Sequence, residues 1–300
     1  MEVLVFGAGS LGSLVGGLLA HAGHDVTLVG RDPHVAAVRE SGLRVEGAGT
    51  DGGFTVHPEA RTTPPETAEL AVVTVKAFDT AAAARALEGV PEVTLSLGNG
   101  MGNEAVLAER LDGPVLAGTC TYGALRPDPG LVRCTGVGEV VLGPREGGES
   151  AAADRVGAAF ADAMVTEVVP DMPRRLREKL AVNAGINAPT ALARVENGAL
   201  LEGSGNEVAR AAAREVAALA RVEGVELTDA AAVDAVERVA DATATNRSSM
   251  LQDVERGRRT EVDAISGYVA DRGRELGVET PVKATLAALL RTWERGRGLR

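Results

Sequence analysis

A glycine-rich segment near the start of the chain constrains the fold more than any other feature. Gly7-Ala8-Gly9-Ser10-Leu11-Gly12 follows the apolar run Val3–Phe6 and leads into the helix-like stretch Leu11–Ala22. In such a strand–turn–helix context, the spacing G-x-G-x-x-G is typical of a dinucleotide-binding turn. Its glycines permit the tight turn, the approach of a pyrophosphate and close helix–strand packing. The helix that follows would offer free N–H groups to the phosphates. The alternative is a purely structural turn.

Further short apolar runs repeat the alternation of strand and helix over the first 170 residues. Near-continuous apolar strands separated by helices indicate a parallel sheet that is covered on both faces. The later runs Leu131–Cys134 and Glu139–Leu142, around turn-forming residues 135–138, predict a hairpin. The other predicted strands are Val26–Val29, Leu70–Val75, Val93–Leu97 and Val115–Thr119, and the intervening helices are Thr80–Leu87 and Asn103–Leu111.

The pattern changes after Pro170, where only helical periodicity is found. We therefore expect an α/β protein with an N-terminal Rossmann-type doubly wound parallel sheet (residues 1–168) and an all-α C-terminal domain (residues 169–300). The predicted helices of this second domain are Arg174–Ile186, Asn206–Glu223, Ala230–Ala242, Ser249–Arg256, Glu261–Leu276 and Val282–Trp293.

Composition narrows the class of partner. The net charge of −11 argues against nucleic acid or an anionic membrane, because both require a basic face. The two cysteines, Cys120 and Cys134, form neither a disulfide framework nor a metal-ligand spacing, so no metal is expected. No export signal and no apolar run near ~20 residues is visible, which predicts a cytoplasmic protein. The oligomeric state cannot be read from the sequence, and a homodimer stays open.

The end of the second predicted strand bears on the choice of cofactor. An NAD site usually places an acidic residue there, on the ribose 2′-hydroxyl. This strand ends Leu28-Val29-Gly30-Arg31, and an arginine suits the 2′-phosphate of NADP(H). The neighbouring Asp32 would accept a hydrogen bond from an unphosphorylated ribose, so NADH stays an alternative. We expect NADPH.

Two further polar residues follow predicted strands. Lys76 ends the third strand, and Asn99 stands between glycines after the fourth. Ligands bind at the carboxyl ends of strands in such sheets. Asn99 would then lie beside the nicotinamide ribose and the substrate, but simple turn chemistry explains it equally well.

In the helical half, Lys179, Asn183 and Asn187 fall at i, i+4 and i+8, which places them on one side of a helix. Asparagine is a poor helix former, so this spacing indicates a polar patch facing a cleft. The alternative is that Asn187 ends the helix before Pro189 and that Lys179 extends to solvent. Ser248 and Thr260 have the character of helix caps.

The combination of motifs resembles the ketopantoate reductase (2-dehydropantoate 2-reductase) family over essentially the full chain. The segments that carry the resemblance are GAGSLG, VTVKAF, GNGMG, REKLAVNAGINAPTAL, ENGAL and NRSSMLQDVERGRRTEVDAISGYV, in that order. One departure is Ala188-Pro189, where the family commonly has proline directly after asparagine. The resemblance implies reduction of 2-dehydropantoate to (R)-pantoate by NADPH, in pantothenate and coenzyme A biosynthesis.

The resemblance also implies roles for individual residues. Lys179 would be the general acid, and Asn183, Asn187, Asn197 and Ser249 would hold the hydroxyl and carboxylate of the substrate. The cofactor and the reacting end would be lined by Lys76, Asn99, Ala124 and Glu261, with Asn99 shared with the substrate.

Elementary chemistry agrees with a lysine donor. Hydride addition to a ketone builds negative charge on oxygen, and a positioned proton donor lowers that barrier. No histidine follows His57, and arginine effectively cannot give up its proton. Lys283 is a further lysine without an assigned role. Two alternatives stay open, namely a related dehydrogenase acting on another 2-keto acid or hydroxyacid, and a non-enzymatic NADP(H)-binding sensor.

Overall fold

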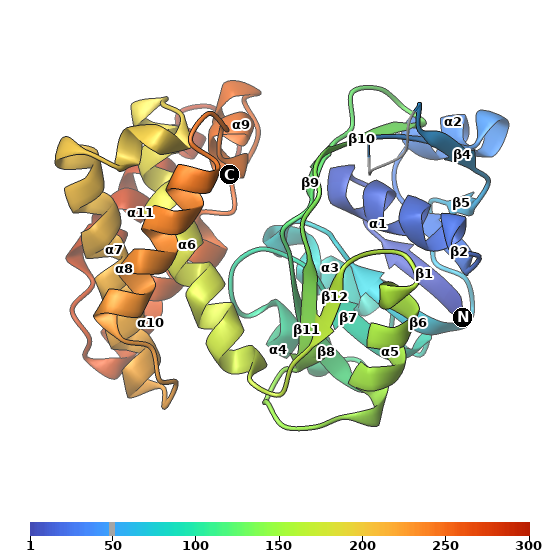
Figure 1. Ribbon diagram of the computed structural model, residues 1–300, viewed down its shortest axis with the longest axis horizontal. Helices are drawn as coiled ribbons and strands as arrows, with labels where there is room; N and C mark the ends of the chain where they lie inside the picture. Colours follow the sequence, from blue (N-terminus) through green and yellow to red (C-terminus); the bar gives the residue numbers. More distant parts are fainter. Residues whose placement is uncertain (48–51) are drawn as a thin grey trace. The chain divides into compact units, whose positions relative to one another are not determined.

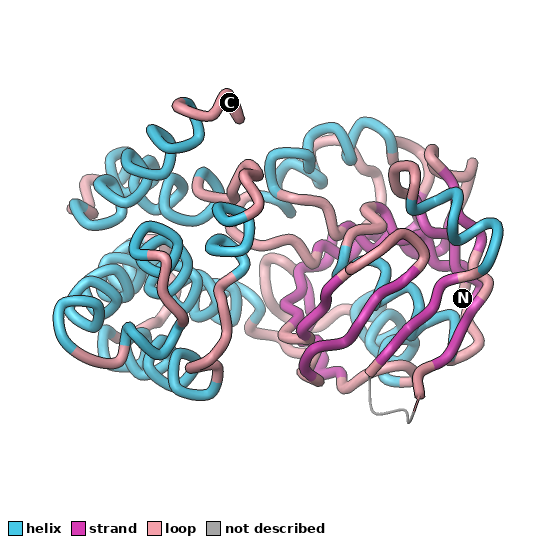
Figure 2. The backbone as a smooth tube through the Cα atoms, turned by 90° about the horizontal axis from the view of Figure 1, so that it is seen from above, coloured by secondary structure: helices cyan, strands magenta, loops and turns pink. Residues whose placement is uncertain are grey.

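The computed structural model describes residues 1–47 and 52–300, which divide into two compact units (Figure 1). The first unit comprises Met1–Gly98 and Gly102–Met172, and the second comprises Asn99–Met101 and Pro173–Arg300. The strands lie in the first unit, whereas helices and loops make up the second (Figure 2). The boundary expected after residue 168 stays a prediction.

The main sheet of the first unit has eight strands in the order β12-β11-β8-β7-β6-β1-β2-β5. The six strands from β8 to β5 are parallel, β11 is antiparallel to β8, and β12 is parallel to β11. In chain order the six parallel strands follow the 3-2-1-4-5-6 arrangement of dinucleotide-binding sheets, which confirms the predicted fold class. The strands are β1 (Glu2–Phe6), β2 (Asp25–Val29), β5 (Glu59–Arg61), β6 (Ala68–Val73), β7 (Pro91–Ser96), β8 (Val115–Cys120), β11 (Val140–Pro144) and β12 (Thr166–Val168).

Both faces of this sheet are buried, as its apolar strands require. In β1, Val3 and Val5 belong to one core cluster, whereas Leu4 belongs to another. Because side chains alternate along a strand, these two clusters lie on opposite faces. Helices α1 (Ser10–His21) and α5 (Ala151–Ala161) supply the first cluster, and α3 (Thr80–Ala86) and α4 (Asn103–Ala108) the second.

A second sheet corrects the predicted hairpin. It has the order β4-β3-β10-β9, and β10 (Leu131–Gly136) pairs with β3 and β9 in it, whereas β11 pairs with β8 of the main sheet. The two runs are therefore strands, but the pairing was wrong. Apolar alternation defines which face of a strand is buried, not which strand lies beside it. The remaining strands are β3 (Leu43–Glu46), β4 (Phe54–Val56) and β9 (Gly123–Leu125).

The second unit confirms each predicted helix, with changed ends. The helix predicted as Arg174–Ile186 is longer and continues through Pro189, and the segment predicted from Glu261 begins with a π-helical turn. Alanine dominates the core of this unit, which lets the helix backbones approach closely. The elements are α6 (Met172–Ala193), η2 (Asn197–Leu200), α7 (Gly203–Val222), α8 (Asp229–Ala242), α9 (Ser249–Glu255), η3 (Asp263–Gly267), α10 (Tyr268–Leu276) and α11 (Pro281–Arg295).

Candidate functional site

The glycine-rich turn joins β1 to α1 with the predicted geometry. Gly7 has a φ of +114°, and its N–H donates to the carbonyl of Val29 at 2.9 Å. A Cβ on Gly12 would lie 2.3 Å from the Gly7 oxygen and 2.4 Å from the Thr74 hydroxyl. Since real Cβ atoms do not approach so closely, only glycine fits where the helix meets the strands. The turn is therefore fixed by its own packing.

Gly9 differs from its two neighbours in the motif. A Cβ on Gly9 would meet nothing closer than the Gly7 oxygen at 3.8 Å, and φ is not in the left-handed region. Packing therefore does not require a glycine here. Among the described residues no side chain caps α1, which begins at Ser10. An open cradle in front of uncapped helical N–H groups fits a diphosphate.

Arg31 follows β2, as predicted, and its side chain is 88% exposed. Its guanidinium lies 3.2 Å from a carboxylate oxygen of Asp79. The carboxylate of Asp32 instead accepts a hydrogen bond from the N–H of Ala36 at 3.2 Å, in the first turn of α2 (His34–Ser41). Asp32 thus hydrogen-bonds to the first turn of α2, while Arg31 presents a cation at the solvent-exposed end of β2.

The other candidate residues of the first unit lie on nearby segments. Lys76 is half-buried and precedes the short helix η1 (Ala77–Asp79), and Ala124 is half-buried in β9. Sequence analysis missed Arg126, two residues further on. Its backbone N–H donates to the Ser10 hydroxyl and its guanidinium to the Ala8 carbonyl, both at 3.1 Å. A positive charge therefore stands beside the glycine-rich turn, and no spacing rule would have found it.

In the second unit, α6 carries Lys179, Asn183 and Asn187. Lys179 and Asn183 are half-buried, and Asn187 is buried. The Nδ2 atom of Asn183 is buried, and within the described part of the chain it has no hydrogen-bond partner. A buried donor without a partner costs about 1–3 kcal/mol, so this amide is poised for an acceptor supplied by a ligand. Because α6 runs to Ala193, the alternative that Asn187 ends the helix is wrong.

Thr190 connects this part of α6 to the start of α9. Its hydroxyl donates to the carbonyl of Ile186 at 2.7 Å and lies 2.8 Å from the hydroxyl of Ser248. Ser248 in turn accepts from the N–H of Leu251, which confirms it as the cap of α9. Ser249 is the exposed first residue of that helix. Through the hydroxyl of Ser248, the start of α9 is thus hydrogen-bonded to α6, the helix that carries Asn183 and Asn187.

Asn197 begins the short helix η2 and is attached to the segment before α9. Its backbone N–H donates to the Asn246 carbonyl at 3.0 Å, and its Nδ2 donates to the Thr243 hydroxyl at 2.9 Å. Its Oδ1 is buried and has no partner among the residues that the structure describes. Asn197 therefore keeps one buried polar atom unsatisfied, as Asn183 does.

Asn99 and Glu261 form a pair that the sequence separates widely. The segment Asn99–Met101 belongs to the second unit, where the amide of Asn99 donates to the Glu261 carboxylate at 3.3 Å. Glu261 is 5% exposed. The N–H of Met101 donates to the Ala264 carbonyl at 3.0 Å, which fastens the segment next to this pair. The side chain of Asn99 therefore makes a tertiary contact in addition to its place in the turn.

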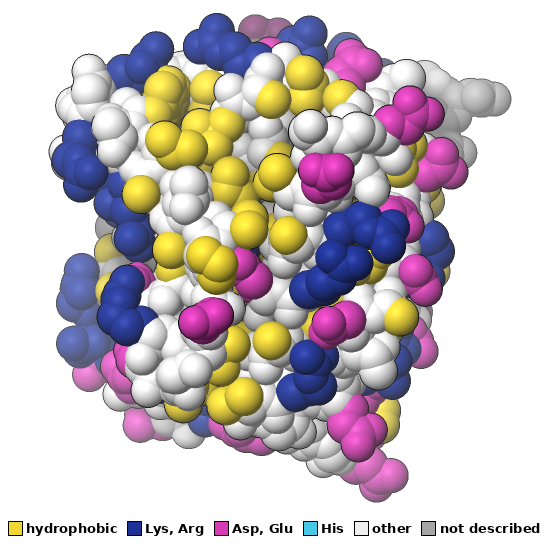
Figure 3. Space-filling model, turned by 90° about the vertical axis from the view of Figure 1, so that its left-hand side faces the viewer, with side chains coloured by type: hydrophobic (Ala, Val, Ile, Leu, Met, Phe, Trp, Pro, Cys, Tyr) yellow, Lys and Arg dark blue, Asp and Glu magenta, His cyan; other side chains and the backbone are white. Residues whose placement is uncertain are grey.

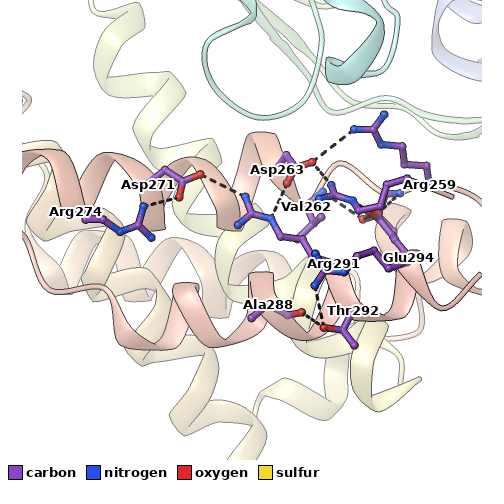
Figure 4. A network of polar contacts seen from close by, with 12 residues as sticks. Arg259, Val262, Asp263, Asp271, Arg274, Ala288, Arg291, Thr292 and Glu294 are labelled. Carbon is purple, nitrogen blue, oxygen red and sulfur yellow. Dashed lines mark hydrogen bonds and ion pairs between the residues drawn. The ribbon is translucent and has the colours of Figure 1, made fainter. Parts of the chain in front are cut away.

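A network of polar contacts around Asp263 and Glu294 holds the backbone near Glu261 (Figure 4). Glu294, fully buried on α11, accepts from the N–H and the hydroxyl of Thr260 at 2.7 and 2.6 Å, and from Arg300 at 2.8 Å. Asp263 accepts from Arg291 at 2.8 Å and also from Arg300. Burial raises the pKa of Asp263, but these arginines outweigh it and hold that pKa below its ordinary value. Thr260 on one side of Glu261 is therefore held by hydrogen bonds to Glu294, and Asp263 on the other side by ion pairs with Arg291 and Arg300.

Taken together, the parallel sheet, its glycine-rich turn and the attached helical unit define a dinucleotide-binding α/β protein. The family model "Ketopantoate reductase PanE/ApbA" matches residues 3–147, and the model of its C-terminal domain matches residues 171–294. The chain belongs to the ketopantoate reductase family, which is NAD(P)-dependent, and it is accordingly an oxidoreductase.

Individual relatives agree with this assignment. The chain is 45% identical to the 2-dehydropantoate 2-reductase of Halobacterium salinarum, over 98% of this chain and 99% of the relative. The ketopantoate reductase structure from Ralstonia eutropha is 34% identical, with a TM-score of 0.91 over 99% of this chain and 100% of that one. A D-mandelate dehydrogenase structure with NADH shares the fold, with a TM-score of 0.92 at 24% identity over 100% of both chains.

Proposed function

We propose that this protein catalyses the reduction of 2-dehydropantoate to (R)-pantoate with NADPH, with Lys179 as the general acid. The observation that carries the proposal lies in the helical unit. Asn183 and Asn197, which the family resemblance assigns to the substrate, each keep a buried polar atom without a partner among the described residues. Buried polar groups are normally paired, so these atoms point to a polar ligand.

The chain's own residues account for the polar part of the reaction. A bound nicotinamide would supply the hydride to the ketone carbon. Lys179 stabilises the negative charge that develops on the ketone oxygen and donates the proton to it. Asn183, Asn187, Asn197 and Ser249 orient the hydroxyl and carboxylate of the substrate. Asn99, paired with Glu261, positions the reacting end.

The first unit supports NADPH as the preferred cofactor. We assign the diphosphate to Gly7–Gly12, with Ala8 and Leu11 contributing through the backbone, and the 2′-phosphate to Arg31. One carboxylate oxygen of Asp32 accepts from the N–H of Ala36, whereas Arg31 presents a cation at the end of β2, which suits a 2′-phosphate. Lys76, Ala124 and Glu261 complete the cofactor site in this proposal. NADH binds by the same turn but without the 2′-phosphate contact.

The experiment is to incubate the protein with NADPH and ketopantoate, follow the loss of NADPH absorbance, and identify the product by chiral chromatography. The proposal expects one (R)-pantoate for each NADPH oxidised. Oxidation of NADPH only with other 2-keto acids would instead favour a related dehydrogenase. NADPH binding without turnover of any 2-keto acid would favour a sensor.

Two wider statements belong to the same proposal. The reaction supplies pantoate for pantothenate and coenzyme A biosynthesis. We place the protein in the cytoplasm, which fractionation of cells would test. Among residues 1–47 and 52–300, no helix is long and apolar enough to cross a membrane.

We also propose a homodimer. The helical unit exposes large apolar side chains, including Val208, Val222, Val239 and Leu289, and hydrophobic side chains gather on one face of this unit (Figure 3). Sedimentation equilibrium tests the proposal, and a single species of 30.7 kDa would contradict it.

A further inference from the structure

Lys283, the lysine without a role in the sequence, lies in the core of the helical unit. It is 0% exposed, in the first turn of α11. Its ammonium donates a hydrogen bond to the carbonyl of Ala184 on α6 at 2.8 Å. Ala184 stands between Asn183 and Asn187, so a buried cation contacts the backbone of the helix that carries the candidate substrate residues.

The contact lies one residue before a carbonyl of α6 that has no backbone donor. Pro189 has no N–H and cannot donate to the carbonyl of Gly185, four residues earlier. Side-chain donors meet the carbonyls on both sides of this position, because Lys283 donates to Ala184 and Thr190 donates to Ile186 at 2.7 Å. The path of α6 from Asn183 to Asn187 therefore depends in part on side-chain hydrogen bonds, in addition to the backbone hydrogen bonds of the helix.

Glu215 makes the burial of this lysine tolerable. Its carboxylate, 9% exposed on α7, accepts from the N–H groups of Val282 and Lys283, both at 2.8 Å. Burial lowers the pKa of Lys283 to about 7, although the charge of Glu215 opposes this effect. Burial likewise raises the pKa of Glu215. The hydrogen bonds of Glu215 and Lys283 thus join three helices, α6, α7 and α11.

An apolar side chain of the same length would fill this volume without the cost of burying a charge. What lysine adds is a donor aimed at one carbonyl. We propose that Lys283 is a positioning residue, which holds the stretch of α6 between Asn183 and Asn187 in the orientation that substrate binding requires. The kinetic part of this inference rests on the proposed function, whereas its structural part does not.

The test compares Lys283→Met with Leu290→Ala. Leu290 also lies on α11 and is 1% exposed in the same core, but it belongs to the apolar packing. Hydrogen exchange of the α6 amides, the KM and kcat for ketopantoate, and the Kd for NADPH are measured for both variants.

Lys283→Met should speed exchange across residues 184–190 and raise the KM roughly 10- to 100-fold, because small misplacements of binding groups have large effects. The Kd for NADPH should stay within about twofold, since the glycine-rich turn is untouched. Leu290→Ala should lower the melting temperature and leave the KM unchanged.

The inference is overturned if Lys283→Met keeps the KM and kcat of the parent, or if Leu290→Ala raises the KM equally. Absence of ketopantoate reduction by the parent protein would contradict the proposed function, and the exchange comparison would then decide the positioning role alone. If Lys283→Met does not fold, the double variant Lys283→Met/Glu215→Gln, which removes both buried charges, is measured in the same way.

Discussion

The three lysines of the chain occupy three different environments. Lys76 is half-buried after a strand of the sheet, Lys179 is half-buried on α6, and Lys283 is enclosed in the helical core. All other basic residues are arginines, which hold a charge but cannot release a proton. Of the lysines, only Lys179 shares a helix face with the candidate substrate asparagines. This placement agrees with the proton-donor role that the family resemblance implies for Lys179.

Replacing Lys179 should remove the chemistry and keep the fold. A positioned general acid contributes about 10²–10⁴-fold in rate, so Lys179→Ala should lower kcat by that factor. Lys179→Arg should recover little, because arginine is a very poor proton donor. Steady-state kinetics gives the result, and NADPH fluorescence should report an unchanged Kd. Arg174→Ala, which removes an exposed cation of the same helix, is the control. Near-normal turnover of Lys179→Ala would reassign the donor.

Asn183 should act on substrate and not on stability. Its Nδ2 makes no hydrogen bond to the described residues, so Asn183→Ala removes no native interaction of that atom. We expect a raised KM for ketopantoate with a melting temperature close to the parent's. Asn206→Ala offers the opposite case, because Asn206 donates to Leu200 and Glu237. That variant should lose about 1 kcal/mol of stability and keep its KM. A large drop in the melting temperature of Asn183→Ala would argue for a structural role.

Arg31 should decide the preference between cofactors. A charge-assisted hydrogen bond to the 2′-phosphate contributes about 1.5–3 kcal/mol, less when exposed. Because Arg31 is exposed, Arg31→Ala should raise the KM for NADPH by up to about tenfold and leave NADH nearly unaffected. Arg155→Ala removes an exposed, ion-paired arginine from α5 of the same unit and should change neither value. Equal use of both cofactors by the parent protein would contradict the assignment.

At the scale of elements, the sequence predicts what depends on periodicity and fails where pairing or tertiary contacts decide. The parallel strands and the long helices of the second unit follow from apolar runs and helical spacing. The pairing of β10 and β11 in different sheets does not, because each run reads as a half-buried strand in either arrangement. The family resemblance placed Asn99 and Glu261 at one site, but their hydrogen bond was not predicted, since no local rule joins residues so far apart.

The entry to α2 carries a histidine that should make stability depend on pH. His34 is 2% exposed, accepts from the N–H of Gly130 and lies 2.9 Å from the Ser13 hydroxyl. Burial, assisted by the charge of Arg126, lowers its pKa to about 4 from 6.5. Between these values the unfolded chain binds a proton that the folded chain does not, so stability falls as pH drops from 6.5 to 4.

The shift in the pKa of His34 corresponds to a loss of about 3 kcal/mol in the free energy of unfolding between pH 6.5 and pH 4. Above pH 6.5 the shift makes no contribution. Urea unfolding at a series of pH values measures it. In His34→Gln the slope between pH 4 and 6.5 should be smaller than in the parent. His57→Gln, at an exposed histidine, should leave the slope unchanged. A parent protein whose stability is flat across this window would contradict the account of His34.

At the scale of the whole molecule, each unit contributes a different part of the proposed reaction. The first presents a fixed glycine-rich turn with Arg31 and Arg126 as cations, and the second presents Lys179 and asparagines with unsatisfied polar atoms. The same fold also serves a D-mandelate dehydrogenase. Because one fold hosts several substrates, the proposed substrate residues of the helical unit, and not the fold, would select the keto acid.

The central claim is most directly tested by the ratio of kcat/KM for ketopantoate to that for 3,3-dimethyl-2-oxobutanoate, which differs only in lacking the hydroxyl. A site built to hydrogen-bond a substrate hydroxyl leaves its own buried groups unpaired when that hydroxyl is absent, so discrimination is large. With NADPH, the account predicts a ratio of about 100 or more in favour of ketopantoate. Equal kcat/KM values for the two keto acids would show that the asparagines do not read the hydroxyl and would contradict the account.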